Sequence, residues 1–347
     1  MQSRLDLLIL RDMTESFDFY GFRVILASDH AEIVQEVKRD FAWFAIRTEE
    51  SSRVAMTVSV HFEEPPYASL PAVPASVLTP RNVSFRDGDI SYVDYFGRGL
   101  AIVNSTAGTC DIYGADFDLV REIAYLFLLS TVGQYLDSIG MHRVHAMGVN
   151  YKGHGVLLLL PSGGGKSTMT MALLGHPDFT ILSEDTPLLD RSGCLHPFPL
   201  RLGFRNDGGA DVPVEQRRTL NRMEFDPKTF VDVEFFSHKV SPPVKASLVL
   251  IGERNLGNES AIVPLSRRRA LEGIIQYLVV GLGVYQGLEF LLERGLWDMT
   301  GKTGVAFSRL RNGIKLLRRA PASKFILGRD TARNTRTLIE FIQRRYG

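Results

Sequence analysis

Cysteine is scarce in this chain of 347 residues, and only Cys110 and Cys194 occur. They lie far apart in the sequence and form no CxxC pair, which argues against a zinc site and against a disulfide framework. We therefore expect the protein to reside in a reducing cytoplasm. An excess of one charge is also lacking, because 40 basic and 39 acidic residues leave a net charge of +1. This balance predicts no nucleic-acid partner and no attraction to an anionic membrane.

Long hydrophobic runs are missing as well. The N-terminal stretch MQSRLDLLILRDM carries an apolar run that is too short and too soon interrupted for a signal peptide. The most apolar later run, Leu278–Tyr285, sits within residues 271–292, where charged residues and glycines are interspersed. That composition favours a buried helix over a membrane span, so no membrane partner is expected. Internal repeats and low-complexity tracts are lacking too.

The composition is that of a globular protein, with 45% hydrophobic and 23% charged residues. A chain of this length favours about two domains. We expect an α/β fold with an N-terminal α/β domain over residues 1–115, a linking helix over 116–139 and a second α/β domain over 140–347. The first domain holds no motif with recognisable chemistry, so its role is not predicted.

Short apolar or alternating runs predict most of the strands and helices. In the first domain the predicted helix is Ala31–Phe44, with Asp29 as its N-cap. The strands predicted there are Phe22–Ala27, Val54–Phe62, Ser91–Tyr95 and Gly99–Asn104. The linking helix, Asp116–Ile139, has an amphipathic pattern and ends before Gly140, where a C-terminal glycine is typical.

The second domain contains almost continuously apolar runs that are typical of strands buried on both faces. These are Val144–Asn150, Gly155–Leu160, Phe179–Leu182, Ala246–Gly252 and Lys324–Leu327. The first two are expected to pair as a hairpin that turns at Tyr151–Gly155. Helices are predicted at Met169–Leu174, Arg267–Leu292 and Thr335–Arg345.

A glycine-rich turn follows the second of these strands and leads directly into a helix. Its residues are Ser162, Gly163, Gly164, Gly165, Lys166, Ser167 and Thr168. Strand, glycine-rich turn and helix N-terminus are the context of a P-loop (Walker A) nucleotide site, because backbone N–H groups and the helix dipole attract phosphate. Lys166 is expected to contact the β- and γ-phosphates of ATP, and the Ser167 hydroxyl to join the shell of a Mg²⁺ ion. Leu160 replaces the usual first glycine of the motif.

Two adjacent carboxylates, Glu184 and Asp185, end the strand after this loop. Neighbouring residues of an extended segment point to opposite sides, so different roles are expected. One would support Mg²⁺ and the other would accept the proton of an attacking hydroxyl or water. The alternative is a solvated turn before Pro187. His145, ahead of the hairpin, is a candidate to donate to the γ-phosphate or to tune the acidic pair, and the alternative is a packed or surface histidine.

Three segments together resemble the HPr kinase/phosphorylase superfamily: His145–Gly153, Gly155–Ser167 and Ile181–Asp185. That family carries a histidine ahead of a hairpin, an S-G-x-G-K-S loop and a later acidic pair, and it shares its P-loop core with phosphoenolpyruvate carboxykinase. The resemblance implies such a kinase-like core over residues 140–347, with ATP, Mg²⁺ and transfer of a phosphoryl group to a serine hydroxyl. It does not extend to residues 1–115.

The resemblance also assigns roles. Lys166 and Ser167 match the phosphate and metal positions, and Glu184 and Asp185 match an acidic pair that consists of two aspartates in HPr kinases proper. Because the side chain of Glu184 is one methylene longer, Asp185 is the expected metal support beside Ser167. The predicted catalytic residues are His145, Lys166 and the two acids.

Further toward the C-terminus, Pro197–Arg205 resembles the proline-rich strand of HPr-kinase-related proteins. Arg201 and Arg205 are therefore candidate phosphate ligands, with exposed surface positions as the alternative. The expected acceptor is a hydroxyl of a peptide, a protein or a small molecule, and the family implies a homo-oligomer. Leu160 and Glu184 favour a second hypothesis, a nucleotide sensor or scaffold without catalysis. A third hypothesis is an ATPase that remodels a partner.

Overall fold

The structure, a computed structural model, describes residues 13–46, 54–160, 165–204, 212–223, 225–279 and 298–347. It is a mixed α/β protein, as the sequence predicts, with several mixed sheets. Contacts divide it into two compact units. The first includes the chain up to Tyr135 and Thr219–Lys228, and the second includes Leu136–Arg218, Thr229–Tyr285 and Lys302–Gly347. The division thus falls inside the helix that the sequence treats as a linker.

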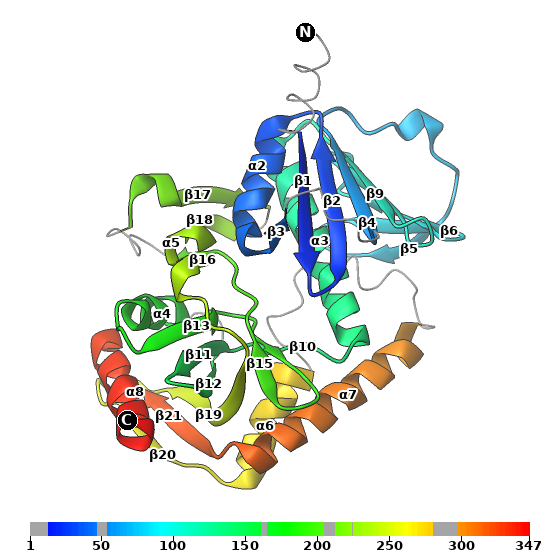
Figure 1. Cartoon of the computed structure of the whole chain (residues 1–347). Helices are drawn as coiled ribbons and strands as arrows, with labels where there is room; N and C mark the ends of the chain where they lie inside the picture. The colour runs from blue at the N-terminus through cyan, green and yellow to red at the C-terminus, as the bar shows by residue number, and fades with distance from the viewer. Residues whose placement is uncertain (1–12, 47–53, 161–164, 205–211, 224, 280–297) are drawn as a thin grey trace. The chain divides into compact units, whose positions relative to one another are not determined.

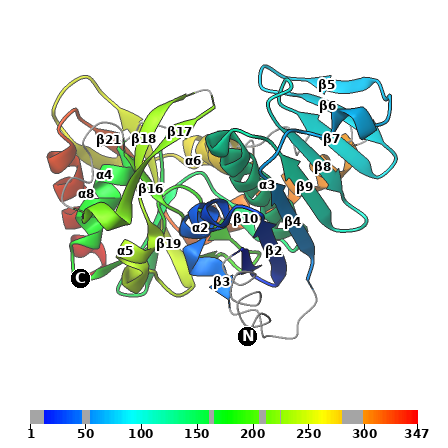
Figure 2. The same cartoon turned by 90° about the horizontal axis from the view of Figure 1, so that it is seen from above.

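A nine-stranded sheet forms the first unit, in the order β3-β1-β2-β4-β9-β8-β7-β6-β5 (Figure 2). Strands β2, β4 and β9 run parallel, and the other neighbours are antiparallel. The bounds are β1 Thr14–Phe19, β2 Phe22–Ser28, β3 Ala45–Ile46, β4 Met56–His61, β5 Ala75–Leu78, β6 Val83–Asp87, β7 Ile90–Asp94, β8 Leu100–Asn104 and β9 Thr109–Tyr113. The predictions for β2, β4, β7 and β8 are confirmed, and the other five strands were not predicted.

Helix α2 (Ala31–Asp40) confirms the first predicted helix, which continues as the 3₁₀ turn η1 (Ala42–Phe44). The predicted N-cap is wrong, because His30 occupies that position. The carboxylate of Asp29 is engaged elsewhere: its Oδ1 accepts a hydrogen bond of 3.0 Å from the backbone N–H of Phe62. The cap was misplaced because the sequence does not reveal this contact with the end of β4.

Helix α3 (Phe117–Ser138) matches the predicted linking helix, and Gly140 follows it with a φ of +78°, which favours glycine. The predicted amphipathic pattern is wrong, because every residue from 119 to 130 is buried. The stretch even buries Arg121, whose Nη2 donates to the carbonyl oxygen of Asn221 at 3.1 Å. Packing on all sides, rather than one apolar face, therefore stabilises this helix.

The second unit is built on a mixed sheet in the order β10-β14-β15-β19-β12-β11-β13, with β21 beside β19 and β20 beside β21. Its strands β12 (His154–Leu159) and β19 (Val244–Arg254) run parallel, and β12 forms the predicted hairpin with β11 (Met147–Tyr151). A smaller sheet has the order β16-β18-β17. The remaining bounds are β10 His142–Arg143, β13 Phe179–Ser183, β14 Leu188–Leu189, β15 Cys194–His196, β16 Leu202–Phe204, β17 Arg217–Arg222, β18 Phe225–Val231, β20 Ala261–Pro264 and β21 Ala322–Leu327.

Helical segments cover both faces of the larger sheet, as the apolar strands predict (Figure 1). They are α4 Lys166–Leu174, α6 Arg267–Ile274, the π-helix η5 Ile275–Val279, α7 Asp298–Arg319 and α8 Thr331–Tyr346. The short helix α5 (Val233–Phe236) packs with residues of the smaller sheet. Leu158 packs with residues of α4 and α8 on one face. Leu157 and Leu159 pack with residues of α6, η5 and α7 on the other.

The predictions for α4 and α8 are confirmed, and α6 begins at Arg267 as expected. The rest of the predicted helix, from residue 280 onward, lies outside the described residues. Helix α7 was not predicted. Within the described ranges, no helix is both long and apolar enough to cross a bilayer.

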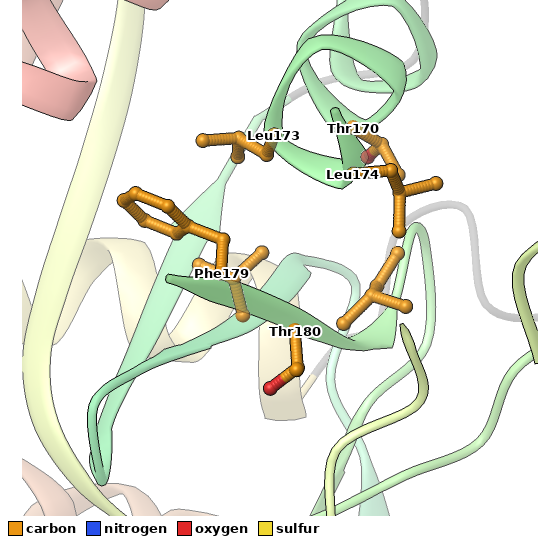
Figure 3. Close-up of a pocket in the computed structure, with 7 residues that line it drawn as sticks. Thr170, Leu173, Leu174, Phe179 and Thr180 are labelled. Carbon is orange, nitrogen blue, oxygen red and sulfur yellow. The ribbon is translucent and has the colours of Figure 1, made fainter. Parts of the chain in front are cut away.

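A shallow hollow lies between α4 and β13 (Figure 3). Its lining residues are Val149, Thr170, Leu173, Leu174, Phe179, Thr180 and Ile181. The hydroxyl oxygens of Thr170 and Thr180 are buried and have no hydrogen-bond partner among the described residues. Burying a hydroxyl without a partner costs free energy, so these two threonines lower the stability of the packing between α4 and β13.

Replacing Thr170 with valine is expected to raise the free energy of unfolding by about 1–2 kcal/mol, because it removes an unpaired buried hydroxyl without changing the branching at Cβ. Thr168→Val is the matched control, since Thr168 is exposed on the same helix. Its effect should stay within about 0.5 kcal/mol. Urea unfolding of both variants measures the difference, and a loss of stability in Thr170→Val would contradict the reasoning.

Candidate functional site

The candidate site lies between the end of β12 and the start of α4. The predicted loop residues Ser162, Gly163 and Gly164 lie outside the described residues. Gly165 is described and is the N-cap of α4, with a left-handed φ of +89° that favours glycine. No side chain caps this helix end. Its N-terminus is therefore suited to bind an anion.

Leu160, which stands where the motif usually has glycine, points its side chain into the core. It is fully buried, and a Cβ added at Gly252 of the neighbouring strand would collide with its Cδ2 atom. Gly252 thus leaves the space that the leucine fills. The main-chain oxygen of Leu160 accepts a hydrogen bond of 3.1 Å from Lys166 Nζ. The substitution at this position therefore affects core packing, while its carbonyl group holds the lysine.

Lys166 brings three segments together. Its ammonium nitrogen lies 3.2 Å from His145 Nε2 and 3.1 Å from Asp185 Oδ1. The lysine is only 6% exposed, whereas the side chain of Asp185 is 34% exposed. His145 precedes β11 and Asp185 follows β13, so the sheet places both beside the first residue of α4. The predicted convergence of these three residues is thus present in the geometry.

His145 is buried and held by the π-helix η5. Its backbone N–H donates to the carbonyl oxygen of Tyr277 at 3.0 Å, and its ring lies parallel to the Tyr277 ring at 6.0 Å. Burial lowers the pKa of His145; the charge of Asp185 raises it and the charge of Lys166 lowers it further, so the net shift is downward. A neutral imidazole can accept a hydrogen bond from the Lys166 ammonium group at Nε2. Its own hydrogen is then on Nδ1.

The Nδ1 atom of His145 is an unsatisfied buried group. It lies 3.3 Å from Asp185 Oδ1, close enough for an ion pair, yet it makes no hydrogen bond with any described residue. A hydrogen bond needs alignment as well as a short distance, and the two atoms are not aligned for one. A buried polar atom without a protein partner is left to bond water or a ligand group.

Ser167 lies among oxygen atoms. Its Oγ is 2.8 Å from Glu184 Oε1 and 2.8 Å from the carbonyl oxygen of Gly203 in β16. A serine hydroxyl carries one proton and can satisfy only one of these two acceptors at a time. Oxygen-rich surroundings of this kind are those that Mg²⁺ prefers. The residues present therefore fit a Mg²⁺ ion.

The two acids lie in a bend just after β13, rather than in the extended segment that the sequence predicts, and they have different neighbours. The sequence assigned the metal-supporting role to Asp185, but the structure brings Glu184 to Ser167 and Asp185 to Lys166. Alternation along the strand separates the two side chains without telling which one faces the loop. No cluster of three or more His, Cys, Asp or Glu residues is found in the part of the chain that the structure describes. A metal here would need phosphate or water oxygens to complete its shell.

The structure describes only one of the two predicted arginines. The guanidinium of Arg201 lies over the Phe230 ring, 4.3 Å from its centroid. Arg205 lies outside the described residues. Thr168 is exposed in the first turn of α4. The contact of Tyr277 with His145 was not predicted from the sequence. The only signal was that Tyr277 lies in a helix that the sequence predicts to be buried.

Comparison with known proteins adds no name to this site: no protein-family model matches the chain, and no curated protein matches it.

Proposed function

We propose that this protein is an ATP- and Mg²⁺-dependent phosphotransferase with a P-loop core of the HPr kinase/phosphoenolpyruvate carboxykinase type. It transfers the γ-phosphoryl group to a hydroxyl, with serine as the preferred acceptor, of a peptide, a protein or a small molecule. The observation that carries the proposal is the buried Lys166 at the uncapped N-terminus of α4, held between His145 and Asp185. A buried lysine at a helix N-terminus otherwise opposes the helix dipole, so an anionic ligand explains its position.

Phosphate binding rests on the first turn of α4. The N–H groups after Gly165 and the ammonium group of Lys166 attract the β- and γ-phosphates. Lys166 keeps its place in the absence of substrate through the carbonyl oxygen of Leu160 and the carboxylate of Asp185. Positioning and charge stabilisation of this kind are the main contributions of a protein to phosphoryl transfer.

Ser167 and Glu184 would hold Mg²⁺, which would supply positive charge to offset the charge of the phosphate oxygens. Asp185, which is partly exposed, accepts the proton of the acceptor hydroxyl. The oxygen of that hydroxyl bonds to the γ-phosphorus while the bond between the γ-phosphorus and the β–γ bridging oxygen breaks. His145, neutral because of its lowered pKa, orients Lys166 through its Nε2 atom.

The proposal is tested by incubating the full-length protein with Mg²⁺ and ATP labelled on the γ-phosphate, with and without a mixture of serine-containing peptides. Label on peptide serine that depends on Lys166 supports the kinase. Steady release of phosphate that the peptides do not change supports the ATPase hypothesis instead. Binding of ATP without any turnover supports the nucleotide sensor, and absence of both binding and turnover contradicts every nucleotide-dependent function.

A further inference from the structure

A second cation lies next to the predicted phosphate loop, on the strand beside it. Arg254 is the last residue of β19, which runs parallel to β12 on one side and to β21 on the other. The carboxyl ends of these three strands therefore meet at one edge of the sheet. Ligands of open α/β sheets bind at that edge. Gly165 and α4 follow the carboxyl end of β12, so Arg254 belongs to the same edge.

The guanidinium of Arg254 reaches over Gly165. A Cβ added to Gly165 would lie 3.8 Å from Arg254 Nη2, which is ordinary van der Waals contact. The Arg254 side chain is exposed, and no hydrogen bond or ion pair joins it to another described residue. Its neighbour Glu253 is already paired with Lys324 at 2.7 Å. The positive charge of Arg254 is thus open to an anion at the N-cap of α4.

Two features of the site point independently to an anionic ligand with hydrogen-bonding oxygens. Lys166 is 94% buried at the same helix end, and the Nδ1 atom of His145, a residue only 3% exposed, has no hydrogen-bond partner among the described residues. A planar guanidinium can donate two parallel hydrogen bonds to one phosphate group, which an ammonium group cannot do. Arg254 and Lys166 together offer two cations of different geometry to one phosphate chain.

We propose that Arg254 binds the phosphate chain of the nucleoside triphosphate from the β19 side of the N-terminus of α4. The inference rests on the proposed function, because it assigns a further ligand to the same nucleotide site. It adds Arg254 to the predicted phosphate ligands.

Calorimetric titration with ATP and Mg²⁺ tests this assignment in the full-length protein. Arg254→Ala is expected to weaken ATP binding about tenfold or more, as expected for the loss of hydrogen bonds to a charged group. Arg254→Lys should bind with intermediate affinity, because it keeps the positive charge but loses the two parallel N–H donors of the guanidinium group. Arg336→Ala, which changes an exposed arginine of α8, is the matched control and should bind like the wild type.

Inorganic tripolyphosphate and adenosine, titrated separately, show which part of the nucleotide Arg254 contacts. Weaker binding of tripolyphosphate to Arg254→Ala, with adenosine unaffected, supports the assignment. Equal ATP affinity in Arg254→Ala and the wild type overturns it and leaves the proposed function intact, as does a loss confined to adenosine. If the wild type itself fails to bind ATP, both the proposed function and this inference are contradicted.

Discussion

Replacing Arg309 with methionine is expected to lower the free energy of unfolding by about 3–5 kcal/mol, the usual cost of breaking a buried ion pair. Arg309 is 1% exposed, and its Nη2 and Nε atoms donate to the two carboxylate oxygens of Asp137 at 2.6 and 3.1 Å. Its Nη1 also donates to the carbonyl oxygen of Leu278 in η5 at 3.3 Å. Methionine fills similar space but leaves the carboxylate of Asp137 buried without its main partner.

The pH dependence of this loss follows from the pKa of Asp137. Burial raises that pKa, but the hydrogen bond from His142 and the charge of Arg309 lower it more, so the net value lies below the ordinary 3.8. A carboxylate with a lowered pKa stabilises the fold above its unfolded pKa, and that contribution disappears as the pH falls through the folded pKa. The difference between wild type and Arg309→Met should therefore shrink below about pH 4.

Urea unfolding at neutral and acidic pH measures both effects. Arg311→Met is the matched control, because Arg311 is an exposed residue of the same helix, and its effect should stay within about 0.5 kcal/mol. Equal stabilities of the two variants, or a difference that does not change with pH, would show that the Arg309–Asp137 pair does not stabilise this unit.

Removing the ammonium group of Lys166 is expected to lower the rate of phosphoryl transfer. Lys166→Ala should lower phosphoryl transfer by at least about 100-fold, the usual loss when one preorganised group that stabilises transition-state charge is removed. The fold should persist, because Asp185 is 34% exposed and can be hydrated when its partner is gone. Lys166→Arg should not restore the rate, since the longer planar group cannot occupy the same narrow position between His145 and the Leu160 carbonyl.

Lys245→Ala provides the matched control for this experiment, because Lys245 is an exposed lysine of β19. Initial rates with γ-labelled ATP compare the three variants, and circular dichroism checks that each is folded. A rate for Lys166→Ala equal to that of the wild type would remove the lysine from the reaction. The proposed mechanism would then lose its main phosphate ligand.

Much of the second unit was predictable because its strands are short and apolar on both faces. The runs Val144–Asn150, Phe179–Leu182 and Ala246–Gly252 leave little choice besides buried strands, and the structure has strands in all three. The convergence of His145 with Lys166 followed from the hairpin, whose turn at Tyr151–Gly155 was also visible in the sequence.

Other features depend on tertiary packing that local sequence does not encode. Helix α7 contains three glycines, which oppose helix formation, yet one of them, Gly313, lies so close to Ile274 that no larger residue would fit. The close approach of the two helices thus overrides the local preference. Helix α3 was misread for a related reason, because its buried Arg121 resembles an exposed polar face until its partner Asn221 is known.

The division of roles between Glu184 and Asp185 is the clearest limit of sequence reasoning at the site. Alternation predicts that the two side chains point to opposite sides, but both acids lie in a bend after β13 and reach consecutive residues at the start of α4. Which acid meets Ser167 depends on the twist of the strand and on the position of α4, neither of which the motif specifies. The longer side chain of Glu184 therefore reaches the Ser167 hydroxyl, where the shorter side chain of Asp185 was expected.

Calorimetric titration of the full-length protein with ATP, in the presence of Mg²⁺ and again with the metal chelated, tests the central claim most directly. We expect saturable binding of ATP at one site per chain, weaker binding when Mg²⁺ is removed, and no binding in Lys166→Ala. Absence of binding in the wild type, or binding that neither Mg²⁺ nor Lys166 affects, would contradict a phosphate site at the start of α4.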